Sequence, residues 1–320
     1  MPDLLRIASR ASQLALWQAN YIAGQLRQQS NHLTIEIVEI STTGDRNQQE
    51  DLRSFGGQGV FTNEVQKAIL DGRADVAVHS LKDLPTEPTA GLLLAATPVR
   101  ESRYDVLVLP ETSIPSAPNI LTDVTSLESL LPLQSRVGTG SPRRQAQLLH
   151  HRPDLQMQEI RGNVETRLRK LNEGEYDAII LAEAGLNRLE LQQHISAILQ
   201  PPFVYPAVGQ GALGLECRED DETTINQLRE LNDEKTLNET TAERSLLRNL
   251  RAGCHAPLGV LTLFEQSTSK TETITLEAVV LSQDGTERIF AKLNSPVENA
   301  DLLGEQLADK LRNLGASRLL

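Results

Sequence analysis

The chain has 320 residues, of which 39% are hydrophobic and 23% charged, a composition that predicts a globular protein of two or three domains. Its 43 acidic residues outnumber its 31 basic ones, and the net charge of −12 argues against nucleic acid or an anionic membrane as a partner. Aromatic residues make up only 3%, too few for a base-stacking surface.

The sequence predicts a cytoplasmic protein. No apolar run approaches the roughly 18 residues of a membrane span. The opening stretch, MPDLLRIASRASQLALWQ, places arginines among its apolar residues, which a signal peptide would not do. Two cysteines, Cys217 and Cys254, are too few for a disulfide framework and fit a reducing compartment.

The first part of the chain predicts the order β-α-β-α-β. The expected elements are a strand over 4–9, a helix from about Ser12, a strand over 34–40, a helix over 60–71 and a strand over 74–80. A polar, glycine-rich loop over 42–59 separates the second strand from the second helix and is typical of a mobile cover.

The second part of the chain repeats this order. Strands are expected over 136–140, 155–160 and 177–182, with helices after the first and over 163–171. The junction from Gly72 to Asp75 is matched by the one from Gly174 to Asp177. We therefore expect two similar α/β domains with parallel sheets and a cleft between them, the alternative being a chance likeness of two α/β segments.

The remaining residues predict a third, α+β domain. A helix is expected over 241–250, and a hairpin over 275–293 that turns at Asp284-Gly285 in a type I′ turn. A last helix over 298–314 ends at Gly315. The segments 111–119 and 201–211 have the Pro and Gly density of connectors.

Arginines lie at two strand-to-helix junctions. Ser141 is placed to cap the helix that begins at Pro142, and Arg143 and Arg144 follow in its first turn, where the helix end is already positive. Such arginines either point into water or form an anion site. The same arrangement at the first junction, with Arg10 followed closely by a serine, favours the anion site.

Further basic residues gather in the second half. Between positions 136 and 188 nine basic residues face seven acidic ones, although the whole chain is acidic. Arg161, Arg167 and Arg188 follow or end predicted elements, where ligands of open α/β sheets bind. A substrate with several carboxylates is the natural inference.

Two further segments are candidates for chemistry. Ser80, Lys82 and Asp83 follow a buried strand, where an ionised carboxylate can stabilise a cation and move protons, or simply pair with the lysine. Cys254 follows a glycine, and a lone cysteine is usually inert, but Arg251 and a neighbouring histidine could favour its thiolate. Cys217 fits a structural role, and no metal-ligand spacing or nucleotide-binding motif is found in the sequence.

Long stretches of the chain closely resemble the porphobilinogen deaminase (hydroxymethylbilane synthase) family. In chain order they are RIASRASQLALWQA, FGGQGVFTNEV, GRADVAVHSLKDLP, VGTGSPRRQ, IRGNVETRL, YDAIILAEAGLNRL, PAVGQGALGLECR and AERSLLRNLRAGCHAPLG. They reach to about residue 259, and several are long and specific. The last sixty residues add little to the resemblance.

The resemblance implies a transferase that joins four porphobilinogen molecules head to tail into hydroxymethylbilane, releasing ammonia, in tetrapyrrole (porphyrin, heme or chlorophyll) biosynthesis. It implies two α/β domains like those of periplasmic binding proteins around a cleft, and a smaller α+β third domain. The expected boundaries are 1–103 with 212–229 for the first domain, 104–205 for the second, and 233–320 for the third. The family further suggests a monomer.

The family's functional residues can be carried over position by position. The resemblance implies that Asp83 is the catalytic carboxylate and that Cys254 holds one dipyrromethane cofactor per chain in a thioether. The side chains implied to bind that cofactor are Arg143, Arg144, Ser141, Thr139, Lys82, Ser80, Arg167 and Arg188. Those implied to bind the substrate porphobilinogen are Arg10, Ser12 and Arg161, and no metal is implied.

The chain departs from the family's pattern at a few positions. Gln58 replaces a common lysine in the loop, Gly140 and Pro142 replace a serine and a leucine, and Ala252 replaces a glycine before the cysteine. Two rival functions remain: a non-catalytic protein that binds a carboxylate ligand between two lobes, and an enzyme that uses Cys254 as its nucleophile in every turnover.

Overall fold

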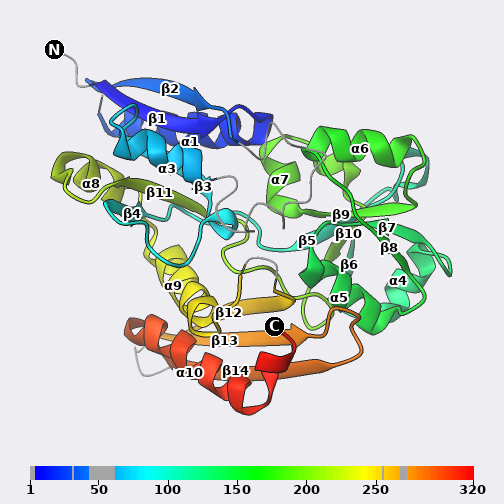
Figure 1. Cartoon of the computed structure of the whole chain (residues 1–320). Helices are drawn as coiled ribbons and strands as arrows, with labels where there is room; N and C mark the ends of the chain where they lie inside the picture. Colours follow the sequence, from blue (N-terminus) through cyan, green and yellow to red (C-terminus); the bar gives the residue numbers. More distant parts are fainter. Residues whose placement is uncertain (1–3, 31, 43–61, 254–255, 267–271) are drawn as a thin grey trace. The chain divides into compact units, whose positions relative to one another are not determined.

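Three β-sheets organise the part of the chain that the structure describes (Figure 1). The computed structural model describes residues 4–30, 32–42, 62–253, 256–266 and 272–320. Within these ranges no helix is both long and apolar enough to cross a membrane.

The first sheet has five strands in the order β2-β1-β3-β11-β4. Strand β1 pairs in parallel with β2 and β3, whereas β11 runs antiparallel to β3 and β4. The apolar side of the first helix packs on this sheet, with Ile22 and Leu26 against Ile7 and Leu215. The elements are β1 (Leu4–Arg10), α1 (Gln13–Gln29), β2 (Thr34–Ile40), α3 (Asn63–Leu70), β3 (Val76–Ser80), β4 (Leu92–Ala96), β11 (Leu213–Arg218) and α8 (Glu222–Arg229).

The second sheet has six strands in the order β6-β10-β5-β9-β7-β8. Its core joins Leu107 and Ile180 of the central strands to Leu127 and Leu148 of two covering helices. The elements are β5 (Asp105–Val108), β6 (Asn119–Leu121), α4 (Val124–Leu130), β7 (Arg136–Gly138), α5 (Pro142–His151), β8 (Gln156–Gln158), α6 (Val164–Asn172), β9 (Ala178–Ala182), α7 (Glu183–Arg188) and β10 (Ala197–Leu199).

The two sheets share one topology, which confirms the repeated order seen in the sequence. Read from the opposite edge, β8-β7-β9-β5-β10 corresponds strand for strand to β2-β1-β3-β11-β4, and the directions agree as well. The expectation of parallel sheets was wrong for one strand in each, because β11 and β5 run antiparallel to both of their neighbours. Strands β5 and β11 are each the first strand after the chain passes from one compact unit to the other, so no β-α-β crossover links them to a sheet neighbour and nothing forces a parallel pairing.

The matched junctions carry the same side-chain contact in both sheets. The Asp75 carboxylate accepts hydrogen bonds from the backbone N–H and from Nη2 of Arg6, both at 2.9 Å. The Asp177 carboxylate accepts from the same two groups of Arg136, at 2.7 and 2.8 Å. The first pair joins β1 to the residue before β3, and the second joins β7 to the residue before β9. The repeat therefore extends to individual side-chain contacts.

A three-stranded antiparallel sheet, β12-β13-β14, forms the third part of the fold. Leu303 and Leu307 of the last helix pack against Ile274 and Leu276 of the central strand. The elements are α9 (Glu234–Asn249), β12 (Leu258–Gln266), β13 (Glu272–Leu281), β14 (Arg288–Pro296) and α10 (Ala300–Asn313). The predicted hairpin and last helix are confirmed, while the helix expected over 241–250 begins earlier, at Glu234.

The predicted type I′ turn of this hairpin was wrong. A type I′ turn needs positive φ at both central residues, but only Gly285 of the pair has one, at 74°. The Gly285 N–H donates to the carbonyl of Ser282, so the turn begins one residue earlier than a type I′ turn at this pair would. The Asp284 carboxylate accepts from the hydroxyl of Ser282 and from the N–H of Thr286, which holds the longer loop closed.

Contacts divide the chain into two compact units. One unit is Met1–Glu101 with Gly211–Leu237, and the other is Ser102–Gln210 with Asn238–Leu320. The first unit contains the five-stranded sheet, and the second contains the six-stranded and the three-stranded sheets. The three domain boundaries expected from the sequence stay a prediction.

Candidate functional site

A pocket of about 90 Å³ opens in the first unit, where parallel strands β1 and β3 end. The side chains around it come from the two strand ends and from the starts of helices α1 and α3. They are Arg10, Ser12, Leu14, Ala15, Gln18, Thr62, Val65, Val78, His79, Ser80 and Asp83. The pocket therefore brings together four of the predicted site residues, which the sequence places about seventy positions apart.

Local structure explains how these residues reach the pocket. Ser12 caps α1, because its hydroxyl accepts a hydrogen bond from the N–H of Ala15 at 3.4 Å. Ser80 ends β3, and its hydroxyl accepts from the Nε2 of Gln18 at 2.9 Å. Asp83 ends a short 3₁₀ turn, Leu81–Asp83, that follows the strand, and its side chain is exposed. The turn thus presents the carboxylate to the pocket from a buried strand.

A buried polar network lies beside the pocket. The Glu216 carboxylate in β11 accepts two hydrogen bonds from the Nε2 of Gln66, at 3.2 and 3.0 Å. One of its oxygens lies 2.9 Å from the Nε2 of His79. These three buried side chains connect α3, β11 and β3, so the walls of the pocket are tied to one another.

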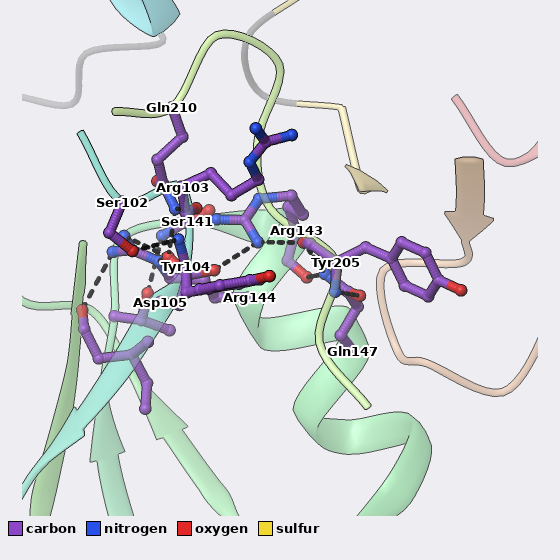
Figure 2. Close-up of polar contacts among 12 residues, drawn as sticks. Ser102, Arg103, Tyr104, Asp105, Ser141, Arg143, Arg144, Gln147, Tyr205 and Gln210 are labelled. Atoms are coloured by element: carbon purple, nitrogen blue, oxygen red, sulfur yellow. Dashed lines mark hydrogen bonds and ion pairs between the residues drawn. The ribbon is translucent and has the colours of Figure 1, made fainter. Parts of the chain in front are cut away.

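In the second unit, predicted site residues gather around Asp105, as Figure 2 shows. The Nη1 of Arg143 donates to the Asp105 carboxylate at 2.6 Å, and the Nε of Arg144 donates to it at 2.9 Å. Gln210 adds a third donor at 3.0 Å. Burial by itself would raise the pKa of Asp105, but the two guanidinium groups outweigh it and hold that pKa well below its usual range.

The two arginines are therefore anchored inside the protein, and neither points into water. Arg144 donates its third nitrogen to the carbonyl of Ile180 at 3.0 Å, so all three nitrogens have protein partners. Arg143 also donates to the carbonyl of Tyr205 at 2.6 Å, but its buried Nε has no hydrogen-bond partner among the described residues. The pair carries one more positive charge than Asp105 neutralises, which leaves an excess for an anionic ligand.

The expectation that Ser141 caps α5 was wrong in part. Ser141 occupies the position before Pro142, but its side chain makes no capping hydrogen bond. Instead its N–H donates to the hydroxyl of the buried Thr139 at 3.2 Å. Gly140, one of the departures from the family, lies where an added Cβ would approach the carbonyl of Ile160 to 3.3 Å.

The other predicted arginines of the second unit lie on separate elements. Arg161 pairs with Glu159 at 2.6 Å, and the Nε of Arg167 donates to the carbonyl of Gly162 at 2.9 Å. Arg188 is buried at the end of α7. The ligand-binding roles expected for these three arginines stay a prediction.

Two of the sequence predictions concern residues outside the described ranges. Cys254, expected to hold the cofactor, and Gln58, in the polar loop, both lie there. Cys217 is described, and its structural reading is confirmed: it is fully buried in β11. Burial raises the pKa of its thiol to about 11, so it is protonated and unreactive at neutral pH.

Sequence reasoning missed several residues of these two clusters. Thr62, Glu216 and Gln210 gave no signal, because a single polar residue within an apolar or connecting stretch can face either way. Asp105 had a weak signal, as an acid directly before the apolar run 106–109. An acidic residue next to a buried strand needs a cationic partner, but its partners Arg143 and Arg144 lie 38 and 39 positions further along the chain.

Comparison with known proteins gives matches over the whole chain. Residues 5–226 match the family model described as porphobilinogen deaminase, dipyromethane cofactor binding domain, and residues 237–313 match its C-terminal domain. The porphobilinogen deaminase of Syntrophotalea carbinolica is 44% identical over 99% of this chain and 95% of its own length. That of Nitrosomonas europaea is 44% identical over 100% and 98%.

Solved structures with a related backbone are more distant. The BenM effector binding domain with its effector benzoate matches 77% of this chain and 92% of its own at 15% identity, with a TM-score of 0.42. A similarity this low carries no argument about function. The two family models and the relatives matched over nearly their full length show the family instead. This chain belongs to the porphobilinogen deaminase family, the dipyrromethane-containing hydroxymethylbilane synthases of tetrapyrrole biosynthesis.

Proposed function

We propose that the pocket around Asp83 is where porphobilinogen loses ammonia, and that Asp83 is the catalytic residue of the condensation. The supporting observation is that this carboxylate shares one pocket with Arg10, Ser12 and Ser80. A cation, an anion and two hydroxyls around a small volume suit a substrate that carries an amine and two carboxylates.

The chemistry of deamination explains why a carboxylate is needed. When the protonated amino group of porphobilinogen leaves as ammonia, the methylene carbon that carried it becomes electrophilic and positive charge spreads to the pyrrole nitrogen. An ionised Asp83 stabilises that charge, and it can accept the α-proton that is lost once the new carbon–carbon bond has formed. Arg10, with Ser12 beside it, binds a carboxylate arm of the substrate through charge-assisted hydrogen bonds. Arg161 is proposed to hold a further carboxylate of the substrate.

The residues of the second unit fit a cofactor with several carboxylates. The fit rests on the excess positive charge around Asp105 and on the buried Nε of Arg143, which has no partner within the described ranges. When bound, the dipyrromethane supplies a pyrrole α-carbon to which the first substrate unit is joined. We propose that Cys254 attaches it and that the following side chains hold its acidic arms: Arg143, Arg144, Thr139, Ser141, Lys82, Ser80, Arg167 and Arg188.

Two variants test these roles by intact mass and by turnover. Asp83→Asn should keep the mass of the attached cofactor but lose product formation by about 100-fold or more, because the cation loses its counter-charge. Cys254→Ser should lack the added mass of two condensed porphobilinogen units. Wild-type protein with the bare polypeptide mass and no activity after supply of substrate would favour the non-catalytic binding protein. Normal turnover of Asp83→Asn together with loss of all activity in Cys254→Ser would favour the thiol enzyme.

We further propose a cytoplasmic monomer that binds no nucleic acid. The net charge of −12 supports the absence of nucleic-acid binding, since the protein would repel a polyanion. Sedimentation at micromolar concentration should give a mass near the 35.2 kDa of one chain, and a value twice as large would contradict it.

A further inference from the structure

Thr62 is a buried residue whose hydroxyl has no partner within the described ranges. Its side chain is 1% exposed, and its Oγ1 has no hydrogen-bond partner in the described parts of the chain. More than nine in ten buried polar groups of proteins are hydrogen-bonded, so an unpaired hydroxyl calls for an explanation.

Helix capping does not explain this hydroxyl. Thr62 immediately precedes α3, and its carbonyl accepts from the N–H of Gln66 at 2.8 Å, but its side chain makes no capping hydrogen bond. Its backbone has helical angles, φ −110° and ψ −30°, whereas a capping residue is normally extended. The polar side chain therefore contributes nothing to the start of the helix.

The position of Thr62 connects it to the substrate pocket. It lines the pocket that also contains Arg10 and Asp83. The other two hydroxyls of the pocket have protein partners: that of Ser12 accepts from the N–H of Ala15, and that of Ser80 bonds to Gln18. Among the described lining residues, Thr62 thus holds the hydroxyl that remains for a ligand.

The surroundings of Thr62 indicate which group it binds. It lies at the N-terminal end of α3, where the helix dipole favours a negative charge, and the pocket's cation, Arg10, favours the same. No hydrogen bond to a described residue restrains the hydroxyl, so turning it toward the pocket breaks none of the contacts that the structure describes. Gln66 fastens α3 to Glu216, so the helix holds the residue in place.

We propose that Thr62 is a substrate-binding residue, which donates a hydrogen bond to a carboxylate oxygen of the incoming porphobilinogen. This inference rests on the proposed function of the pocket. It adds to Arg10 and Ser12 a contact from a separate helix, so the carboxylate arm is held from two sides. One oxygen accepts from the hydroxyl, and no covalent bond changes.

The substitution Thr62→Val tests this, because valine has the same shape without the hydroxyl. In the holoenzyme we expect the KM for porphobilinogen to rise about tenfold, as for one lost hydrogen bond to a charged group, with kcat nearly unchanged. Thr62→Ser should restore a KM near that of the wild type. The thermal unfolding midpoint without substrate should stay the same or rise in Thr62→Val, because an unpaired buried hydroxyl is removed.

Thr224 provides a matched control. It is also a buried threonine at a helix start of the first unit, but its hydroxyl donates to Asp221 at 2.8 Å. Thr224→Val should therefore lower the unfolding midpoint and leave KM unchanged. A wild-type KM in Thr62→Val, or a fall in its midpoint like that of Thr224→Val, would overturn the proposal. Normal turnover of Asp83→Asn would instead refute the catalytic role of Asp83 and leave this KM comparison standing.

Discussion

Asp105 shows how the role of single residues depends on partners far away in the sequence. The sequence placed Arg143 and Arg144 at a helix start and left open whether they face water or an anion. In the structure the anion is a side chain of the protein itself, 38 and 39 positions earlier. The contact keeps two guanidinium groups fixed while leaving them one positive charge in excess.

We predict that Asp105→Asn is strongly destabilising, because it leaves two buried guanidinium groups without their counter-charge. Breaking a buried ion pair costs about 3–5 kcal/mol, which should appear as a large drop in the thermal unfolding midpoint. Asp154→Asn is the control, since Asp154 pairs with one arginine and reaches solvent, so its loss should be clearly smaller. Equal losses in the two variants would show that burial of the pair does not matter.

The acid stability of the protein should follow from the same carboxylate. The pKa of Asp105 is lower in the folded protein than in the unfolded chain, where it is about 3.9. The folded state is therefore stabilised at pH values above about 4, and this stabilisation is lost progressively as the pH falls below that value.

At the scale of elements, the repeated Arg–Asp contact is the strongest sign that the two α/β halves are built alike. The sequence pointed to it through two similar junctions, although it could not show that a strand start and a distant aspartate meet. The halves differ in their surroundings. The Asp75 carboxylate has a second partner, Arg218, at 3.0 Å, while that of Asp177 is more exposed.

We predict a graded effect of removing the two carboxylates. Asp75→Asn should lower the unfolding midpoint more than Asp177→Asn, because Asp75 is less exposed and pairs with two arginines. The pKa of each carboxyl is lowered, so both contributions should fade as the pH drops below about 4. Thermal unfolding of the two variants at pH 7 and pH 3.5 measures this, and an equal loss at pH 7 would contradict the ranking.

Elements with a long, regular pattern of apolar residues were predicted best from the sequence. The strand over 34–40 alternates over seven residues and was found at its exact bounds. The short strands β5, β6 and β10 were not predicted, since short apolar runs are equally compatible with a helix or a loop. The equally short β7 and β8 were predicted, because each stands directly before a predicted helix in the repeated order. The turn at Asp284-Gly285 was misjudged because a dipeptide signal does not specify the loop length.

For the whole molecule, the division into two units groups the second α/β sheet with the three-stranded sheet. The carbonyl of Gly285, in the hairpin loop, lies 2.8 Å from the Nδ1 of His150 in α5. The hydroxyl of Tyr205 donates to Glu277 of β13 at 3.1 Å, while its carbonyl accepts from Arg143. The sheet of the third domain thus supports the helix that carries the arginine pair.

We therefore predict that destabilising the third sheet also loosens α5. Leu276→Ala removes a fully buried side chain from β13, at a cost of about 2–5 kcal/mol, and should speed hydrogen exchange in β12, β13, β14 and α5. Strands β1 and β3 should exchange as before. Leu215→Ala, an equally buried position in β11, is the matched control and should loosen the first unit alone. Faster exchange confined to the third sheet in Leu276→Ala would contradict this coupling.

The sequence by itself determined the fold class, the internal repeat, the family, and the neighbourhood of Asp83, because these depend on local periodicity and on motifs of adjacent residues. Only the tertiary structure decided that Asp105 pairs with both Arg143 and Arg144, that Glu216 joins α3 to β3, and that the hydroxyl of Thr62 has no partner among the described residues. The contacts of Asp105 and Glu216 join residues 38 to 150 positions apart in the sequence. Burying a polar side chain without a partner is costly, so its role depends on which distant residue the fold places beside it.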